Sequence, residues 1–460
     1  MKNEYYFDRS GFGESDLNDL IDNAKSAQLR SFLKDAVSDN EDLAVRLQTY
    51  LTPKNGKVNI NANKQLVDRV VDKYTRHGNY ISYRFTGDFI IEMEDVLCHS
   101  IDPLIKAEKY DDAFDLLGYV FIQTVLTDMD DDGELSMFGD FCAEYWGNII
   151  AKADKTQKPK YFKWFEEHID GSLVDYMEDY LLNAMENFFD DKEFLGKKLE
   201  FAEKKAASIA DISDYHNKYE KERWVMLHIG FMEKSKCSDE EIFAYCKENR
   251  KLPQVRQYCA EKHISRNEIP AAIAVLKESL EIDKDAAGLI SSHRHKLKDL
   301  YKQLNDTESY REQLRILLTK CNAGVDDYRE LKSLYSPKEW NKERENIFIS
   351  NYHKADFYRE EKLWDRLLKY VTNNSIFDLK RYEPDLVKIY PQEILQLYVS
   401  ELKRSAKQAH SRSTYSQWAQ TLKHMKTIEG GPVIVNELLN EWRQVYRNRP
   451  AMMQELEVVD

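Results

Sequence analysis

Three aspartates at alternating positions form the clearest candidate metal-binding pattern of the chain. Asp128, Asp130 and Asp132 are followed by Gly133 and by the apolar Leu135. This order matches the start of a calcium-binding loop, in which carboxylates at positions 1, 3 and 5 face one ion and a glycine at position 6 allows a sharp turn. Apolar residues at helical spacing flank the loop on both sides. The pattern therefore predicts a metal site at Asp128, Asp130 and Asp132.

The end of the calcium pattern is absent. Position 12, where a glutamate normally supplies two ligand oxygens, is Gly139, and Asp140 comes one residue late. Loss of this ligand weakens calcium binding. The alternative interpretation is a polar turn between two helices, whose carboxylates stabilise the positive N-terminal end of the next helix.

A second pattern is a basic segment in an otherwise acidic chain. Residues 402–428 contain no Asp or Glu, whereas residues 88–145 contain sixteen acidic and two basic residues. The basic segment predicts a surface that binds phosphate groups or an acidic partner, and its aromatic residues are candidates for stacking on a nucleobase. The predicted binding residues are Lys403, Arg404, Lys407, Arg412, Lys423 and Lys426, with Tyr415 and Trp418 as the stacking residues. In the alternative interpretation, both rings pack inside the last helical hairpin, and the charges are solvated or pair with the acidic half in an oligomer.

No pattern in the sequence indicates catalysis. The chain contains no Gly-x-Ser-x-Gly, no phosphate-binding glycine loop that ends in Lys-Ser or Lys-Thr, and no His-Glu-x2-His. His293 and His295 are two residues apart, which puts them on different faces of a helix, and they are interpreted as a surface pair. We therefore expect no enzymatic activity and no cofactor.

The composition favours a soluble helical protein. The 460 residues include only 16 Gly and 10 Pro, too few for the many turns of a β-sandwich or barrel. The 28 Tyr suit the half-buried faces of stacked helices, because each combines an apolar ring with a polar tip. The formal net charge of −14 disfavours binding to bulk nucleic acid. Six scattered cysteines, no signal peptide and no apolar stretch long enough to span a membrane predict a cytoplasmic protein with reduced thiols.

Apolar residues recur at helical spacing along almost the whole chain, which predicts an all-α fold. Helices are expected between residues 17 and 51, at 85–105, 111–127 and 133–153, and again at 391–410, 414–428 and 433–446, where Pro450 ends the last one. Segments 238–249, 269–282, 309–321 and 358–371 resemble one another, because each carries apolar residues at i, i+3, i+4 and i+7, which predicts a helix. Their spacing is typical of helical-hairpin repeats such as the tetratricopeptide (TPR) repeat. We therefore predict an irregular helical-hairpin repeat array, an α-solenoid or TPR-like superhelix with a concave binding groove.

Changes in charge and repeat pattern along the sequence predict four regions. These are an irregular segment (1–16), an acidic helical domain (17–193), TPR-like hairpin repeats (194–390) and basic C-terminal hairpins (391–460).

Three stretches, in this order, resemble the helical region downstream of the zinc finger in bacterial SWIM-type zinc-finger proteins. They are residues 17–51, residues 83–135 and residues 390–451, the last of which begins Tyr-Pro-Gln-Glu-Ile-Leu and ends Trp-Arg-x3-Arg-x-Arg-Pro-Ala. The finger itself needs a Cys-x-Cys pair and a Cys-x-His pair, and this sequence has neither. The resemblance implies a helical architecture and a regulatory or nucleic-acid context, with the finger absent or on another chain. It implies no activity.

The leading functional hypothesis is a non-enzymatic scaffold or adaptor that presents its groove to a protein partner. A second hypothesis is a nucleic-acid-associated accessory protein that contacts phosphates through residues 403–426. A third, weaker hypothesis is a hydrolase whose site is assembled across the superhelix.

Overall fold

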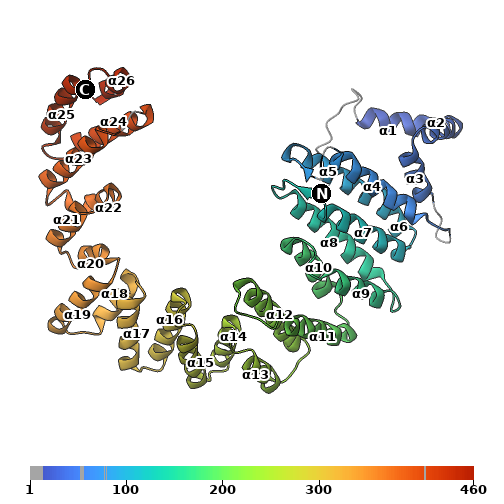
Figure 1. Cartoon of the computed structure of the whole chain (residues 1–460), viewed down its shortest axis with the longest axis horizontal. Coiled ribbons are helices and arrows are strands. Elements are labelled where there is room, and N and C mark those ends of the chain that lie inside the picture. The colour runs from blue at the N-terminus through green and yellow to red at the C-terminus, as the bar shows by residue number, and fades with distance from the viewer. Residues whose placement is uncertain (1–13, 52–55, 77, 79, 409–410, 460) are drawn as a thin grey trace. The chain divides into compact units, whose positions relative to one another are not determined.

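The structure is a computed structural model of the chain, and it describes residues 14–51, 56–76, 78, 80–408 and 411–459. Almost every element is an α-helix, which confirms the predicted all-α helical-repeat class (Figure 1). The chain divides into two compact units, Met1–Tyr245 (unit 1) and Cys246–Asp460 (unit 2).

Unit 1 contains thirteen numbered α-helices in its described part, the last of which ends three residues beyond the boundary. They are α1 (Glu14–Asn23), α2 (Ser26–Ser38), α3 (Glu41–Tyr50), α4 (Ile60–Thr75), α5 (Tyr83–Val96), α6 (Asp102–Lys106), α7 (Tyr110–Val125), α8 (Glu134–Lys152), α9 (Lys158–His168), α10 (Asp175–Phe188), α11 (Lys192–Ser208), α12 (Tyr215–Lys234) and α13 (Asp239–Glu248). A single π-helical turn, Leu97–Ile101, joins α5 to α6, so the helix expected at 85–105 is continuous.

The core of unit 1 forms around α7 and α8. Helix α7 is apolar on most of its circumference, and nine of its sixteen residues are buried, because neighbouring helices cover it on several sides. Aromatic rings fill the space between α7, α8 and α9. Phe121 packs edge-on against Trp146, and Trp146 packs in the same way against Phe165.

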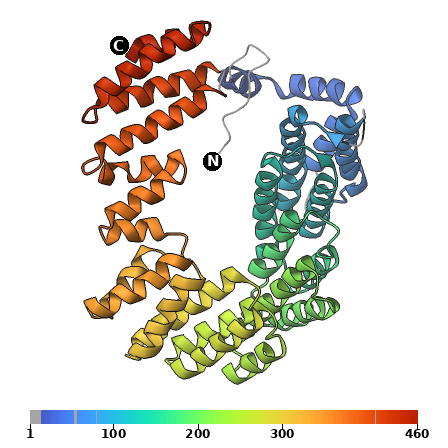
Figure 2. The ribbon, with the colours of Figure 1, turned by 60° about the vertical axis from the view of Figure 1, so that its left-hand side comes forward.

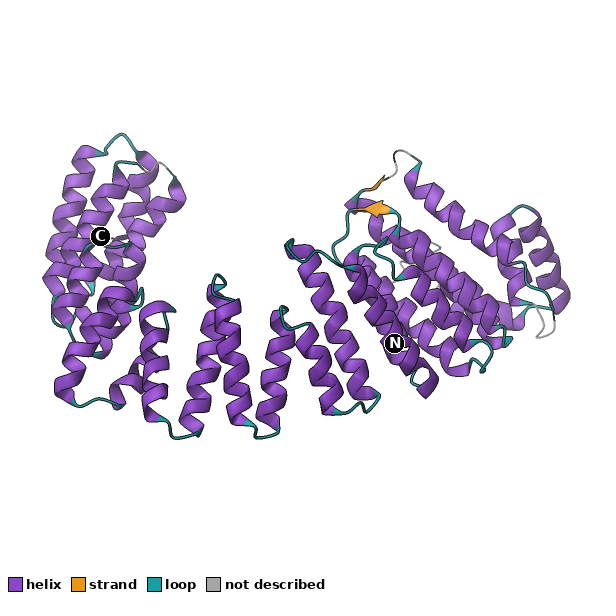
Figure 3. Cartoon of the chain, turned by 60° about the horizontal axis from the view of Figure 1, so that its bottom comes forward, coloured by secondary structure: helices purple, strands orange, loops and turns teal. Residues whose placement is uncertain are grey.

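Two short strands connect distant parts of unit 1. Strand β1 (Tyr80–Ile81) precedes α5, and strand β2 (Asp128–Met129) follows α7. They pair in parallel, with Tyr80 opposite Asp128 and Ile81 opposite Met129, at the end of the helices (Figure 3). The sequence did not predict this pairing, because two-residue strands leave no periodic pattern.

Unit 2 is a succession of helices, most of which pack on their neighbours in the chain (Figure 2). They are α14 (Pro253–Ser265), α15 (Ile269–Ile282), α16 (Ala287–Gln303), α17 (Thr307–Lys320), α18 (Val325–Ser333), α19 (Pro337–Ser350), α20 (Lys354–Glu360), α21 (Trp364–Thr372), α22 (Ile376–Leu386), α23 (Pro391–Ala406), α24 (Arg412–Lys426), α25 (Gly431–Val445) and α26 (Pro450–Leu456), with a final 3-10 turn, Glu457–Val459. Two apolar clusters follow each other along this array, one from Ala260 to Phe357 and one from Ala355 to Val459, and Tyr358 packs against both.

The predicted boundaries at 193/194 and 390/391 stay predictions, and apolar packing continues across both. Phe194 packs against Phe162 and Phe189, so α11 continues the core of the helices before it. The second boundary lies inside the C-terminal apolar cluster. The predicted irregular segment 1–16 lies outside the described residues up to residue 13, and α1 begins at Glu14.

Several tight turns between helices use a residue with positive φ that is not glycine. In five of them, at Glu108, Lys236, Asn267, Asn305 and Lys362, φ lies between 55° and 59°. The next backbone N–H donates to a carbonyl five residues earlier, as from Leu363 to Tyr358, which is the bond that closes a Schellman turn at a helix C-terminus. Such a turn at Lys362 divides the predicted segment 358–371 between α20 and α21, so the expectation of one helix there is wrong.

Proline marks helix starts in this fold. Pro103 begins α6 directly after the π-helical turn, and seven of the other nine prolines lie in the first turn of a helix, where the missing N–H costs no hydrogen bond. One of them is Pro450, which begins α26. The expectation that Pro450 only ends the preceding helix is therefore incomplete.

Tyrosine–carboxylate hydrogen bonds recur between helices in both units. The donor and acceptor lie at least fifteen residues apart in the chain, so each bond joins two elements. Examples are Tyr119 to Asp68, Tyr145 to Asp102, Tyr161 to Asp111, Tyr310 to Glu330, Tyr328 to Glu361, Tyr382 to Asp356 and Tyr398 to Glu383. These bonds agree with the interpretation of the high tyrosine content.

A buried polar cluster joins α14, α15 and α16. The Arg256 guanidinium donates to both carboxylate oxygens of Asp283 at 2.5 Å, and His293 Nε2 lies 2.9 Å from the same carboxylate. All three residues are buried. The interpretation of His293 as a surface residue is wrong, because the array places its ring against Asp283, while His295 stays partly exposed.

Candidate protein-binding surface

The loop between β2 and α8 contains the three aspartates of the predicted metal site, and it is held by the start of α5. The backbone N–H of Asp130 donates to the Ile81 carbonyl at 2.9 Å, and the Thr86 hydroxyl donates to the Asp130 carbonyl at 2.7 Å. The Asp130 carboxylate accepts from the backbone N–H of Tyr83 at 3.3 Å. The strand pairing therefore fixes the loop against residues almost fifty positions earlier in the chain.

Asp131, which the metal pattern does not use, stabilises the start of α8. Its Oδ1 accepts from the backbone N–H groups of Gly133 at 3.1 Å and Leu135 at 2.9 Å. Its Oδ2 accepts from the Tyr176 hydroxyl at 3.2 Å. Gly133 adopts φ of 109°, a conformation that favours glycine. Gly133, the glycine of the predicted calcium loop, is therefore the residue that precedes the first turn of α8.

The carboxylates of Asp128, Asp130 and Asp132 are not brought together as metal ligands. Among the described residues, no group of three or more His, Cys, Asp or Glu side chains is placed to hold a metal ion. The physical reason is that Asp130 bonds to the start of α5, whereas the neighbouring Asp131 carboxylate turns to α8. The arrangement supports the alternative interpretation, a polar turn before a helix.

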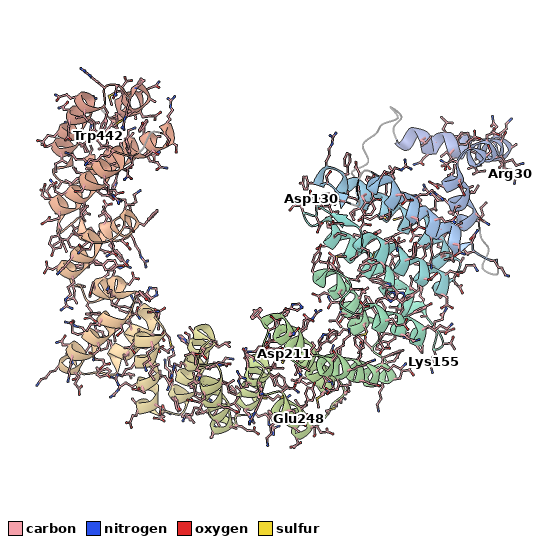
Figure 4. The ribbon with its side chains drawn as sticks, viewed as in Figure 1. Arg30, Asp130, Lys155, Asp211, Glu248 and Trp442 are labelled. Atoms are coloured by element: carbon pink, nitrogen blue, oxygen red, sulfur yellow. The ribbon has the colours of Figure 1, made fainter. Side chains whose placement is uncertain are left out.

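Three exposed tyrosines lie next to the carboxylates of the same loop. Tyr80, Tyr83 and Tyr176 are 46%, 62% and 41% exposed. The Tyr80 side chain hydrogen-bonds to Asp130, the backbone N–H of Tyr83 donates to the same carboxylate, and the Tyr176 hydroxyl donates to Asp131. We call this set the acidic–aromatic surface, and its members are Tyr80, Tyr83, Asp128, Asp130, Asp131, Asp132 and Tyr176. Figure 4 shows Asp130 at an edge of unit 1.

The carboxylates raise the pKa of the tyrosines beside them. For Tyr80 the main cause is the hydrogen bond with Asp130, and for Tyr176 it is partial burial, followed by the charge of Asp131. Both shifts mean that a second negative charge is unfavourable here. The surface is therefore suited to cations.

Two of the four aspartates are free to bind a partner. Asp128 and Asp132 are exposed, and within the described part of the chain their carboxylates accept no hydrogen bond. Carboxylates of this kind pair with Lys or Arg, while tyrosine rings take cation–π contacts and cover the aliphatic stems of the same side chains. Exposed apolar side chains flank the loop in the chain, Leu126 at 58% and Met137 at 64%. Aromatic residues and Met are enriched at protein interfaces.

The sequence located the aspartates of this surface but not its tyrosines. Tyr80 and Tyr83 precede Asp130 by about fifty residues, and Tyr176 follows it by a similar distance. Only the β1–β2 pairing and the packing of α10 on α8 bring them together. No local pattern carries that information.

The predicted stacking residues of the basic segment are buried. Tyr415 and Trp418 are each 4% exposed, and their rings lie 5.2 Å apart. Trp418 also packs against Trp442 of α25 at 5.4 Å. The prediction that these rings stack on a nucleobase is therefore wrong. The helical spacing of Tyr415, Trp418, Leu422 and Met425 was the signal for a buried stripe.

Most cations of the basic segment bond to neighbours within the C-terminal array. Lys403 pairs with Glu441 at 2.6 Å, Arg404 with Glu401 at 2.6 Å, and Arg412 with Glu455 at 2.7 Å. The Lys426 ammonium donates to the Val459 carbonyl. Of the predicted cations, Lys407 and Lys423 are exposed and have no ion pair with the described residues.

The surface also has two small hollows. One, of about 240 Å³, is lined by Val371, Ser375, Ile376, Leu397, Ser400 and Arg404, among others, between α21, α22 and α23. The other, of about 210 Å³, lies in unit 1 beside Trp164 and His168, where Lys64 pairs with Asp115 at 2.7 Å. Both are small compared with typical ligand pockets.

No protein-family model matches this sequence, and no curated protein matches it. Solved structures that share some likeness include a "circular tandem repeat protein with novel repeat topology and enhanced subunit contact surfaces", which is 11% identical over 87% of this chain and 95% of that chain, with a TM-score of 0.19. A human IFIT1 dimer with m7Gppp-AAAA is 11% identical over 89% of this chain and 98% of that chain, with a TM-score of 0.17. At these TM-scores neither likeness carries an argument. The resemblance to SWIM-type proteins stays a prediction.

Within the described residues, none of the helices combines the length and the apolar composition that a membrane crossing requires.

Proposed function

We propose that this chain is a non-catalytic helical-repeat adaptor, and that a basic segment of a protein partner binds to its acidic–aromatic surface. The observation that carries the proposal is that three exposed tyrosines from β1, α5 and α10 lie next to the four carboxylates of residues 128–132. Hydrophobic rings give contact area, and the carboxylates select for Lys or Arg.

The charge of unit 1 supports this choice of partner. Residues 1–245 contain 30 Lys and Arg against 49 Asp and Glu, a formal net charge of −19, whereas residues 246–460 contain 37 against 32, a net charge of +5. A field of this sign attracts basic partners over a distance of about one Debye length, roughly 8–10 Å at moderate salt. Unit 1 is therefore the part of the chain to which a basic segment is drawn.

The test compares two variants that change the net charge equally. Asp128→Lys with Asp132→Lys alters the acidic–aromatic surface, and neither carboxylate holds the loop. Glu240→Lys with Glu248→Lys changes two exposed carboxylates of α13 and is the matched control. Binding of a fluorescent peptide of alternating Arg and Leu to the full chain is measured by anisotropy. The loop variant should bind at least about tenfold more weakly, which corresponds to about 1.4 kcal/mol, and the control should change little.

An equal loss in both variants would mean that the peptide responds only to the overall negative charge, and the proposal would be wrong. Tyr83→Ala is a further variant, which should weaken binding without reducing its dependence on salt. The same variants can then be compared for proteins captured from a lysate, where a true partner is lost with the loop variant and kept with the control.

The nucleic-acid alternative receives less support. Its two aromatic residues are buried, and four of its six cations bond within the chain. Lys407 and Lys423 alone give little basis for phosphate binding.

A further inference from the structure

The first two helices expose an apolar face. Leu17, Leu20 and Ile21 of α1 are 56%, 64% and 47% exposed, and Phe32 and Leu33 of α2 are 70% and 38% exposed. They recur at the spacing of one helix face, which in a globular protein normally contacts a core. None of the thirteen residues of α2 is buried, although α2 packs on α3. We call residues 17–38 the N-terminal arm.

The arm differs in charge from the rest of unit 1. Residues 17–38 contain three acidic and three basic residues, so their net charge is zero, whereas unit 1 as a whole has a net charge of −19. A neutral apolar face does not select a basic partner. It is instead a place where a second acidic chain can approach with little repulsion.

The charges within the arm are also divided between its two helices. The charged residues of α1 are all acidic (Glu14, Asp16, Asp19 and Asp22), whereas α2 has two basic residues, Arg30 and Lys34, and one acidic residue, Asp35. In a symmetric dimer each contact occurs twice, so α1 of one copy can lie against α2 of the other and the reverse. Both pairings then bring opposite charges together. An open hollow beside Leu20, lined by Asp19, Asn23, Ala24 and Gln28, offers a place for an exposed ring such as Phe32 of the second copy.

We propose that the N-terminal arm binds the arm of a second copy of this chain and forms a symmetric dimer. The apolar stripes of α1 and α2 supply the contact, and the opposite charges of the two helices favour the pairing of α1 with α2 of the other copy. This proposal does not depend on the acidic–aromatic surface, which other elements of unit 1 form. Figure 4 shows Arg30 of the arm and Asp130 of that surface at opposite edges of unit 1.

The first test is sedimentation velocity of the full chain over a range of concentrations. The wild type should show a reversible monomer–dimer equilibrium, and Leu20→Asp with Phe32→Asp should abolish the dimer. Val433→Asp with Val445→Asp is the matched control, because these side chains are also exposed, on α25. The control should dimerise like the wild type. Circular dichroism shows whether each variant keeps its helix content.

Charge exchange tests which partner occupies the arm. One variant carries Asp19→Lys and Asp22→Lys, which removes the net negative charge of α1. The other carries Arg30→Glu and Lys34→Glu, so both helices are acidic. Each variant alone should dimerise at least about tenfold more weakly than the wild type, and an equal mixture of the two should form heterodimers of nearly wild-type affinity. Only pairing between two arms predicts this rescue.

Salt gives a further distinction. Binding of a basic peptide to the acidic–aromatic surface should weaken steeply as salt rises, whereas the dimer, whose main contact is apolar, should change less. A wild-type chain that stays monomeric at all concentrations would overturn the proposal. So would a dimer that Leu20→Asp with Phe32→Asp leaves intact, or a mixture of the charge-exchange variants that gains no affinity.

Discussion

Asp283 and Lys198 are single buried residues on which the packing of several helices depends. Burial alone would raise the pKa of the Asp283 carboxyl, but the hydrogen bonds from Arg256 and His293 outweigh this effect and hold the pKa below its usual value. Lys198 of α11 is 1% exposed, and its ammonium donates to the Glu186 carbonyl in the last turn of α10 at 2.7 Å. Burial lowers the pKa of Lys198 to about 8.

Replacement of Asp283 by Asn should destabilise unit 2 by about 3–5 kcal/mol, because the Arg256 charge stays buried without its partner. Urea unfolding of the two proteins measures the difference. Because the pKa of Asp283 is lower in the folded than in the unfolded chain, its contribution is present above about pH 4 and is lost as pH falls through the folded pKa. The difference between wild type and variant should therefore shrink in acid. A constant difference would contradict this assignment.

Lys198 differs from Asp283 because folding disfavours its charged form. Its folded pKa lies below the unfolded value of 10.5, so the folded state binds this proton more weakly, and stability rises as pH increases from about 8 toward 10.5. Relative to Lys198→Met, the wild type should gain about 2 kcal/mol between about pH 7.5 and 9.5. Urea unfolding at several pH values checks this gain. Identical pH profiles would show that the ammonium is well solvated.

For single residues, the sequence predicted the position on a helix better than whether the side chain is buried. Helical spacing placed Trp418 correctly on a helix, but the charges around it suggested a surface that the packing against Trp442 excludes. His293 and His295 were correctly assigned to different faces, yet which face is buried depends on Arg256 and Asp283 of the preceding helices. Contacts across the array decide such questions, and a local pattern does not contain them.

Helices and turns are the elements that the sequence predicts best. The expected helices at 111–127, 133–153 and 269–282 correspond to α7, α8 and α15 to within a few residues, because their apolar residues recur over three or more turns. The turn at Lys362 was missed. It needs a left-handed residue, and the usual signal for one is glycine, which this turn does not use.

Glycine at such a turn should stabilise the chain. Lys362 has φ of 55°, a conformation that costs a residue with a side chain about 1 kcal/mol and costs glycine almost nothing. We expect Lys362→Gly to raise the free energy of unfolding of unit 2 by about 0.5–1 kcal/mol, as measured by urea unfolding. Lys380→Gly, at an exposed position inside α22, should lower it by about 1 kcal/mol. Destabilisation by both changes would contradict the assigned turn geometry.

For the molecule as a whole, the unequal charges of the two units are the main feature. Unit 1 is strongly acidic and unit 2 is slightly basic, and the division between the two units lies at 245/246. A net charge of −19 destabilises unit 1 by self-repulsion, which salt screens.

Hydrogen exchange of the full chain should reveal this difference. Between about 0.05 M and 0.5 M salt, the Debye length falls from about 14 Å to about 4 Å, and protection of α5, α7 and α8 should increase. Protection of α14 to α18 should change less, because unit 2 is nearly balanced in charge. An equal response in both units would show that self-repulsion does not limit the stability of unit 1.

The tyrosine–carboxylate bonds have a consequence in strong base. A phenol that donates its proton to a carboxylate resists ionisation, and the bond with Asp68 raises the pKa of Tyr119 to about 12. In the unfolded chain the same groups ionise near pH 10. Alkali therefore favours the unfolded chain, and phenolate absorbance should appear in two stages. Exposed rings ionise first, and the bonded ones follow only when their helices separate.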